Sequence, residues 1–223
     1  MQNWWVLNAW ETGPIYLVAW VFWVIFSIVL HELGHGWAAI RQGDTTPIET
    51  GHMTWNPLVH MGQTSLIMFA LVGIAWGQMP VSPSRFRGRY GDAYVSFAGP
   101  FMNLLLFIAC SIGGVVYLRL MSTMPEGFAY NLLVFLERGA VLNLALMLFN
   151  LLPVPPLDGS RILGDFWPKY YEMISTERGQ MFTFIAFVVT FMYAGGKIFS
   201  FAAHVNTELW FACVRLLGGG GAP

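Results

Sequence analysis

The chain has 223 residues, of which 56% are hydrophobic and 10% are charged, and its formal net charge is −1. Soluble domains carry about 25% charged residues, so this composition excludes an ordinary soluble domain and indicates a polytopic membrane protein. The balanced charge gives no electrostatic basis for binding nucleic acid. The two cysteines, Cys110 and Cys213, lie in apolar surroundings without CxxC spacing, so we interpret both as small hydrophobic packing residues.

We predict an all-α polytopic membrane protein with about four to six transmembrane or re-entrant helices and one short β-hairpin. Residues 1–223 should form a single membrane-embedded domain, with a core over 14–165 and C-terminal helices over 180–217. The first hydrophobic stretch, residues 15–30, has no charge and continues into the sequence HELGH, so we expect one helix to run on to Ile40. Residues 45–61 combine β-branched residues, prolines and a glycine, which favours a hairpin over a helix.

The next apolar segment, residues 66–79, is too short to cross a membrane. Its 14 residues fall below the roughly 20 that a spanning helix needs. Basic residues stand on both sides of it, at Arg41 and from Arg85 to Arg89, and basic loops prefer the cytoplasmic side. We therefore expect this segment to be re-entrant or interfacial. The N-terminal segment has no basic residue, which predicts an external N-terminus and HELGH near the cytoplasmic face.

Three further apolar stretches follow. Residues 93–118 predict a spanning helix directed outward, and residues 140–152 return inward until prolines break the helix. Residues 181–193 begin another helix, which Gly195 and Gly196 should interrupt. Four ionisable residues then follow at spacings of 7, 4 and 7, namely Lys197, His204, Glu208 and Arg215. This spacing places them on one helical stripe, which we interpret as the wet face of an interfacial helix; the alternative is a seam against another subunit or a substrate.

The sequence HELGH carries the first part of a metal site. Positions i and i+4 of a helix lie on the same face, so His31 and His35 can present two imidazoles to one zinc ion, with Glu32 beside them where a zinc-bound water would lie. An amphipathic helix with two satisfied histidines is the plainer alternative. Ionisable groups next to a membrane segment are costly unless they are functional, which favours the metal site.

A catalytic zinc takes three protein ligands plus water, so one more ligand is required. Asp158 is the best candidate, because it follows the point at which prolines break the inward-directed helix, at the depth where the first helix presents its histidines. Broken helices are tolerated in membranes where protein or a cavity surrounds them. A helix carrying HExxH that meets a broken helix carrying aspartate predicts an intramembrane zinc site.

The pairing of HELGH with NLLPVPPLDG, residues 150–159, resembles the site-2 protease family of intramembrane zinc metalloproteases. Ala98-Gly99-Pro100 with Asn103, and WNPLVH at residues 55–60, look like the compact bacterial branch. The resemblance implies zinc bound by His31, His35 and Asp158, and Glu32 as the catalytic base that activates a zinc-bound water. It also implies an enzyme of the bacterial cytoplasmic membrane that cleaves a membrane-spanning substrate in regulated intramembrane proteolysis. We expect neither of the PDZ and CBS domains that some members carry, and Ser160 stands where many relatives have a second glycine.

Three further polar residues in or beside apolar segments are candidates for substrate or oxyanion contact, with interhelical hydrogen bonding as the alternative; they are Asn150, Asn103 and His60. Two other functions stay open from the sequence alone. One is a catalytically inactive membrane scaffold, against which the presence of Glu32 argues. The other is a metal-ion transporter that uses the same His/His/Asp cluster, although the paired half-repeats of transporters are not visible. The expected partners are a transmembrane substrate and the lipid bilayer, and the sequence leaves the oligomeric state open.

Overall fold

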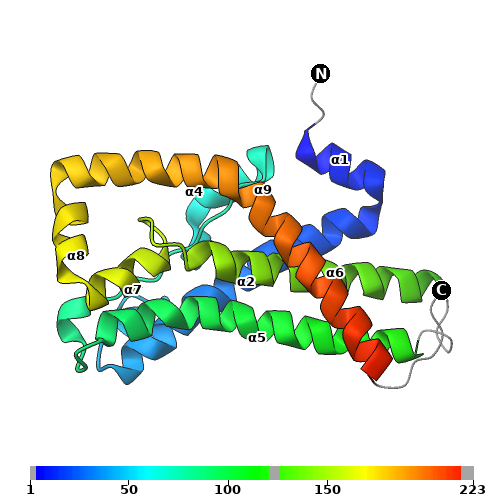
Figure 1. Cartoon of the computed structure of the whole chain (residues 1–223), viewed down its shortest axis with the longest axis horizontal. Helices are drawn as coiled ribbons and strands as arrows, with labels where there is room; N and C mark the ends of the chain where they lie inside the picture. The colour runs from blue at the N-terminus through cyan, green and yellow to red at the C-terminus, as the bar shows by residue number, and fades with distance from the viewer. Residues whose placement is uncertain (1–3, 121–125, 217–223) are drawn as a thin grey trace.

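The computed structural model describes residues 4–120 and 126–216, and every regular element in these residues is a helix (Figure 1). In chain order they are α1 (Trp5–Thr12), α2 (Pro14–Arg41), α3 (Thr46–Glu49), α4 (Pro57–Val72), η1 (Pro83–Arg85), α5 (Gly91–Leu120), α6 (Glu126–Asn150), α7 (Asp158–Phe166), α8 (Pro168–Ser175) and α9 (Glu177–Leu216). Helices α2, α5, α6 and α9 are long and apolar enough to cross a membrane. The prediction of an all-α polytopic membrane protein is confirmed.

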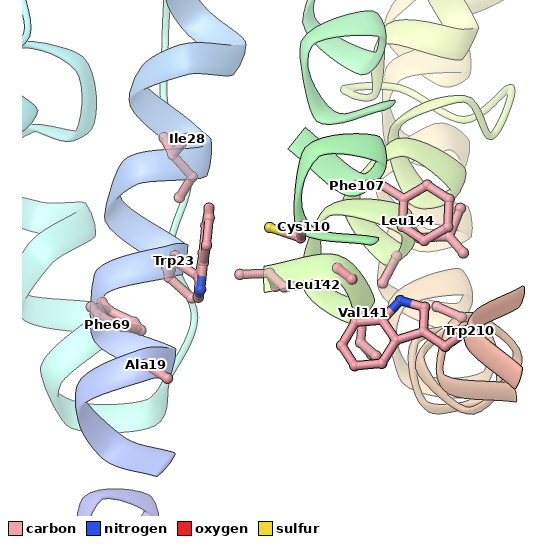
Figure 2. Close-up of a cluster of buried hydrophobic side chains, with 14 of the residues drawn as sticks. Ala19, Trp23, Ile28, Phe69, Phe107, Cys110, Val141, Leu142, Leu144 and Trp210 are labelled. Atoms are coloured by element: carbon pink, nitrogen blue, oxygen red, sulfur yellow. The ribbon is translucent and has the colours of Figure 1, made fainter. Parts of the chain in front are cut away.

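The core consists of α2, α5 and α6, with α5 antiparallel to the other two. Figure 2 shows Trp23 of α2 directed toward Cys110 of α5 and Leu142 of α6. The indole of Trp23 packs against the backbone of Gly139, and its N–H donates to the carbonyl of Phe135 at 2.8 Å. A buried indole N–H needs such a partner, so this bond fixes how α2 and α6 face each other.

Helix α2 carries the HELGH residues on a continuous helix, as expected. Pro14 stands in its first turn, where the missing N–H costs nothing. Its 28 residues correspond to about 42 Å at 1.5 Å per residue, which exceeds the hydrocarbon thickness of about 30 Å. The histidines lie in the last half of the helix, and the residues around them are buried against α5 and α6.

The predicted β-hairpin over 45–61 is wrong. Residues 46–49 form the short helix α3, turns follow, and α4 begins at Pro57. Proline in the first turn favours helix initiation, and it stands there in both helices, at Pro47 and Pro57. The Asn56 side chain caps α4 by accepting a hydrogen bond from the Leu58 N–H at 3.0 Å. The prolines that suggested a hairpin therefore begin helices.

The segment that follows doubles back on itself. Helix α4 ends at Val72, Gly73 adopts the left-handed conformation, and residues 74–82 have no regular secondary structure. Alternate residues, Trp76 and Gln78, bond back toward α4 as in an extended chain, so we call residues 74–79 the extended segment. The extended chain returns beside α4, where the Ser65 hydroxyl donates to the carbonyl of Trp76 at 2.7 Å and accepts from its N–H at 2.9 Å. The 16 residues of α4 are fewer than a spanning helix requires. The expectation that residues 66–79 are re-entrant or interfacial stays a prediction.

The predicted interruption at Gly195 and Gly196 is also wrong, because α9 is one helix of 40 residues. Figure 1 shows that α9 changes direction near its middle: its first half runs along the long axis of the molecule, and its second half crosses α6 and α5. Glycine lowers helix stability by about 1 kcal/mol relative to alanine, which contacts with neighbouring helices can offset. In the second half Ala202, Asn206 and Trp210 are buried, so packing maintains the helix past the glycines.

Candidate active site

Three polar side chains from α2 and α7 converge inside the bundle. His31 Nε2 lies 3.0 Å from His35 Nε2 and 3.1 Å from Asp158 Oδ2. His35 Nε2 lies 3.4 Å from Asp158 Oδ1. Both histidines are buried. These residues form the cluster predicted from the sequence, and their ligand atoms lie within 4.8 Å of one another.

The broken end of α6 brings Asp158 to the histidines. Helix α6 ends at Asn150, and residues 151–157 form turns that contain three prolines before α7 begins at Asp158. Proline has no backbone N–H, so these prolines cannot continue the hydrogen-bond pattern of helix α6. The chain therefore leaves the axis of α6 at this point. Asp158 occupies the first turn of α7, where a negative charge is favoured by the helix dipole.

The hydrogen bonds of His35 define which of its ring nitrogens faces the cluster. Its Nδ1 lies 2.7 Å from the carbonyl oxygen of Val95. A carbonyl can only accept, so Nδ1 carries the proton, and in the neutral ring Nε2 presents a lone pair. This lone pair is directed at His31 and Asp158. The backbone of α5 thereby holds His35 in the tautomer that binds metals through Nε2.

A chain of side-chain amides orients His31 in the same way. His31 Nδ1 donates to Asn103 Oδ1 at 2.6 Å, and Asn103 Nδ2 donates to Asn143 Oδ1 at 3.0 Å. Asn143 Nδ2 in turn donates to the carbonyl of Gly139 at 2.9 Å. Because the last acceptor is a backbone carbonyl, the direction of every bond in the chain is defined. His31 is thus held as the Nδ1–H tautomer, and its Nε2 lone pair also faces the cluster.

The donor set fits a zinc ion. Two imidazole lone pairs and a carboxylate face one another at 3.0–3.4 Å, an arrangement that repels without a cation. Zinc bonds to nitrogen and oxygen of about 2.0–2.2 Å place tetrahedral ligands about 3.3 Å apart, close to these separations. Gly99 of α5 leaves the room required, since a Cβ atom there would clash with the Nε2 atoms of both histidines. His31, His35 and Asp158 are therefore the residues that would hold the metal.

A cavity of about 970 Å³ opens beside this cluster, at the upper end of the size of small-molecule sites. Its polar wall includes Glu32, which is buried but borders the cavity together with the three cluster residues. Its apolar walls come from residues 74–79 and from the first half of α9, including Phe187 and Phe191. An acid–base group and a metal cluster thus share one largely apolar chamber.

The three residues assigned to substrate or oxyanion contact lie in different places. Asn150 borders the cavity, and its Nδ2 donates to Leu146 of its own helix at 3.1 Å. Asn103 is fully buried behind His31, where it orients the imidazole. His60 is fully buried behind the extended segment; its Nε2 donates to the carbonyl of Thr54 at 2.7 Å, and its own carbonyl accepts from Gln78 N–H. Of these three residues, Asn150 is therefore the one that borders the chamber.

Two features of the chamber did not emerge from the sequence. Residues 74–79 border it in extended form, although they follow an apolar helix; the glycines at 73 and 77 and Pro80 were the available signal. Arg161 also borders the chamber, and its guanidinium pairs with Asp92 of α5 at 2.6 Å. This ion pair ties α7, and with it Asp158, to the start of α5.

The chain is similar to several proteins that are named as zinc metalloproteases. A protein of Bacillus subtilis named "Putative zinc metalloprotease YwhC" is 36% identical over 172 residues, which cover 76% of this chain and 78% of that protein. The Mycolicibacterium smegmatis "Putative zinc metalloprotease Rip2" is 32% identical over 142 residues, covering 60% and 52% of the two chains. The Methanocaldococcus jannaschii "Zinc metalloprotease MJ0392" is 27% identical over 165 residues, covering 71% and 39%. No solved structure matches the chain.

The fold and the site define an integral membrane zinc metalloprotease of the site-2 type. The family profile described as "Peptidase family M50" matches residues 111–194, a region that contains Asp158 but not the HELGH residues. Together with the extent of the similarity to YwhC, which includes most of both chains, this match shows that the chain belongs to peptidase family M50. Zinc is accordingly its cofactor.

Proposed function

We propose that this protein cleaves a peptide bond of a membrane-spanning substrate within or near the bilayer, with Glu32 as the catalytic base. The observation that carries the proposal is the position of the chamber. Glu32 and the His31, His35 and Asp158 cluster open into a cavity whose other walls include α9, and both α2 and α9 are long enough to cross the membrane. A substrate helix that lies in the bilayer would thus meet the chemical groups without leaving the membrane.

The chemistry divides between the metal and the chain. His31, His35 and Asp158 would hold the zinc, which would supply a water of lowered pKa and a positive charge beside the scissile carbonyl. Glu32 accepts the proton of the attacking water and delivers it to the leaving amine, as a general base and then a general acid. The two hydrogen-bonded Nδ1 atoms keep the histidine rings in position during this cycle. Asn150, at the chamber wall, is a candidate to bind the substrate backbone or the oxyanion.

The extended segment beside Glu32 offers an edge for the substrate backbone. Trp76 and Gln78 direct backbone groups inward, to Ser65 and to the His60 carbonyl. The intervening residues, Ala75 and Gly77, make no backbone hydrogen bond to any other described residue. An added strand forms hydrogen bonds with the free backbone groups at alternate positions of such an edge. An unwound substrate segment would pair here, and this edge takes the place of the hairpin expected over 45–61.

We also propose the orientation predicted from the sequence. The end of α2, the start of α5 and helix α7 all lie at the same end of the bundle (Figure 1). The loops at this end carry Arg41, Arg87 and Arg89, and positive loops prefer the cytoplasmic side. The N-terminus would then lie outside, and the chamber would open toward the cytoplasmic face of a bacterial cytoplasmic membrane.

The test is cleavage of purified single-span substrates in detergent and in liposomes by the wild type and by Glu32→Gln. The zinc content of both proteins is measured, because Glu32 is not one of the three ligands. We expect cleavage by the wild type alone at equal zinc content. Equal cleavage by both proteins would contradict the role of Glu32, and cleavage confined to soluble peptides would contradict an intramembrane substrate.

A second experiment tests the strand edge. Peptide substrates that are N-methylated at single positions around the scissile bond lose one backbone donor each. Pairing with Ala75 and Gly77 predicts that cleavage falls at every second position, because alternate residues of a strand face the same edge. A loss that is uniform along the peptide would contradict this edge.

A further inference from the structure

Helix α5 carries none of the three residues that would hold the metal, yet it orients two of them. The Val95 carbonyl accepts a hydrogen bond from His35, and Asn103 Oδ1 accepts one from His31. Gly99 lies between these two positions and leaves room for both imidazoles. One helix therefore sets the orientation of both histidines of α2.

The same face of α5 also reaches the helix that carries the third residue. Asp92, Gly99 and Asn103 lie within about 40° of one another around the axis of α5 at 100° per residue. Asp92 Oδ1 accepts a hydrogen bond from the Arg161 guanidinium at 2.6 Å. Arg161 follows Asp158 by three residues on α7, which is nearly one helical turn. The face of α5 that orients the histidines thus ends beside Asp158.

Helix α7 contacts α5 with the side that carries Asp158. At 100° per residue, Asp158, Arg161 and Asp165 lie within about 60° of one another around the axis of α7. Asp165 Oδ2 accepts from the Ala93 N–H at 2.8 Å, next to the pair of Asp92 with Arg161. Two bonds that are one turn apart fix the rotation of α7 about its axis. That rotation decides where the Asp158 carboxylate points.

Two further contacts attach α7 and α8 to the end of α6. Gly159 packs closely against the backbone after α6, since a Cβ atom there would clash with the Leu151 carbonyl. The Tyr170 hydroxyl of α8 donates to the Pro153 carbonyl at 3.0 Å. Neither contact involves α5. When the bond between Asp92 and Arg161 is lost, α7 should therefore stay in place and turn rather than detach.

We propose that Asp92 is a positioning residue of the metal site. It holds Arg161, and Arg161 holds the rotation of α7 that directs Asp158 at His31 and His35. The role is geometric, because an ion pair with 24% of one side chain and 37% of the other exposed contributes little to folding stability. The inference rests on the metal site and not on the cleavage reaction, so its test needs no substrate.

The first measurement is zinc affinity, by competition with a chelator on the purified full chain in detergent. Asp92→Leu keeps a side chain of similar size and removes both acceptor oxygens. Partners of metal ligands contribute about 10–100-fold to metal affinity, and Asp92 acts one side chain further away, so we expect a loss of about tenfold. Glu49→Leu, which breaks the 3.0 Å ion pair with Arg85, is the matched control and should keep the wild-type affinity. Unchanged affinity in Asp92→Leu, or an equal loss in both variants, would overturn the proposal.

A double-mutant cycle then tests whether Asp92 acts through Arg161. Arg161→Leu should lower the zinc affinity by a similar factor, and adding Asp92→Leu to it should cause no further loss, because both changes break one contact. Two losses that multiply would show that Asp92 acts independently of Arg161, which would overturn the proposal.

Cobalt(II) in place of zinc tests the position of Asp158 directly. The visible absorption of this ion depends on the number and geometry of its ligands. The spectrum of Asp92→Leu should change toward that of Asp158→Ala, and the spectrum of Glu49→Leu should match the wild type. A wild-type spectrum in Asp92→Leu would overturn the proposal even if affinity falls. Should leucine prevent folding, Asp92→Asn, which loses only the charge, is measured in the same way with a smaller expected change.

Discussion

The backbone of Gly77 lies against the carboxylate of Glu32. A Cβ atom on Gly77 would lie 2.5 Å from Glu32 Oε1 and 2.7 Å from Ile28 Cγ2, closer than side chains pack. The extended segment therefore limits where the Glu32 side chain can stand. Ser65 and His60 hold the segment in place from the other side, so the position of the catalytic base depends on residues that are distant from HELGH in the sequence.

Gly77→Ala should reduce cleavage while zinc content stays at the wild-type level. The added methyl group must displace either Glu32 or the segment, and a displacement of about 1 Å near reacting groups can cost on the order of 100-fold in rate. The measurement is the cleavage rate at saturating substrate together with bound zinc. Gly195→Ala is the matched control, because it borders the same chamber and its new Cβ would meet no atom within 4 Å. Equal rates for the two variants would contradict the contact.

Asn103→Leu should weaken zinc binding. The variant removes the acceptor of His31 Nδ1–H with little change in volume, and loss of such a supporting hydrogen bond costs about 10–100-fold in metal affinity. Competition with a chelator measures the affinity directly, without a cleavage assay. Asn150→Leu is the comparison, since Asn150 bonds to its own helix and not to a ligand. Zinc affinity that falls equally in both variants would show that Asn103 has no specific role.

Removal of zinc should lower the unfolding temperature. Two imidazole lone pairs and the Asp158 carboxylate lie 3.0–3.4 Å apart, so the ion relieves their repulsion. Free zinc at about 1,000 times its dissociation constant stabilises a folded state by about 4 kcal/mol. Thermal unfolding with and without chelator checks this. Glu32→Gln should retain the full shift and Asp158→Ala should lose it; the reverse pattern would exchange the roles of these two carboxylates.

Asp44→Asn should destabilise the end of the bundle where α2 terminates. Asp44 is fully buried and accepts hydrogen bonds from the Thr46 N–H at 3.0 Å and from the Ser82 N–H at 2.6 Å. An asparagine would direct its NH₂ group at one of these donors, and a buried unsatisfied group costs about 1–3 kcal/mol. Unfolding in detergent measures the loss. Glu49→Gln, at the exposed pair with Arg85, should change stability much less.

The contribution of Asp44 should also depend on pH. Burial alone raises the pKa of its carboxyl, but the hydrogen bonds from Ser82 and Thr46 and the charge of Arg85 outweigh burial and lower the pKa below the ordinary 3.8. Because the pKa is lower in the folded state, the ionised carboxylate stabilises the fold at pH values above its ordinary pKa. This stabilisation is lost as the pH falls from the ordinary pKa through the lowered one. The difference in stability between wild type and Asp44→Asn should therefore shrink between pH 6 and pH 3. A constant difference would contradict a lowered pKa.

The sequence by itself determined the membrane class and the three residues that would hold the metal. A charge-free stretch and the i, i+4 spacing are local properties, so HELGH had to lie on one face of a long helix, and the prolines after Asn150 had to release Asp158 from α6. The break expected at Gly195 and Gly196 and the hairpin over 45–61 were wrong because caps and tertiary packing outweighed local composition.

Only the tertiary structure decided the surroundings of the ligands. Asn103 and Asn150 are both polar residues in apolar helices, yet one orients His31 and the other borders the chamber. Likewise, Gly77 lies against Glu32 because the chain doubles back after α4, and His204 and Glu208 of α9 are exposed because Trp210 of the same helix packs inward. Such relationships join residues that are 40 or more positions apart. They depend on how helices rotate and cross, which local periodicity does not specify.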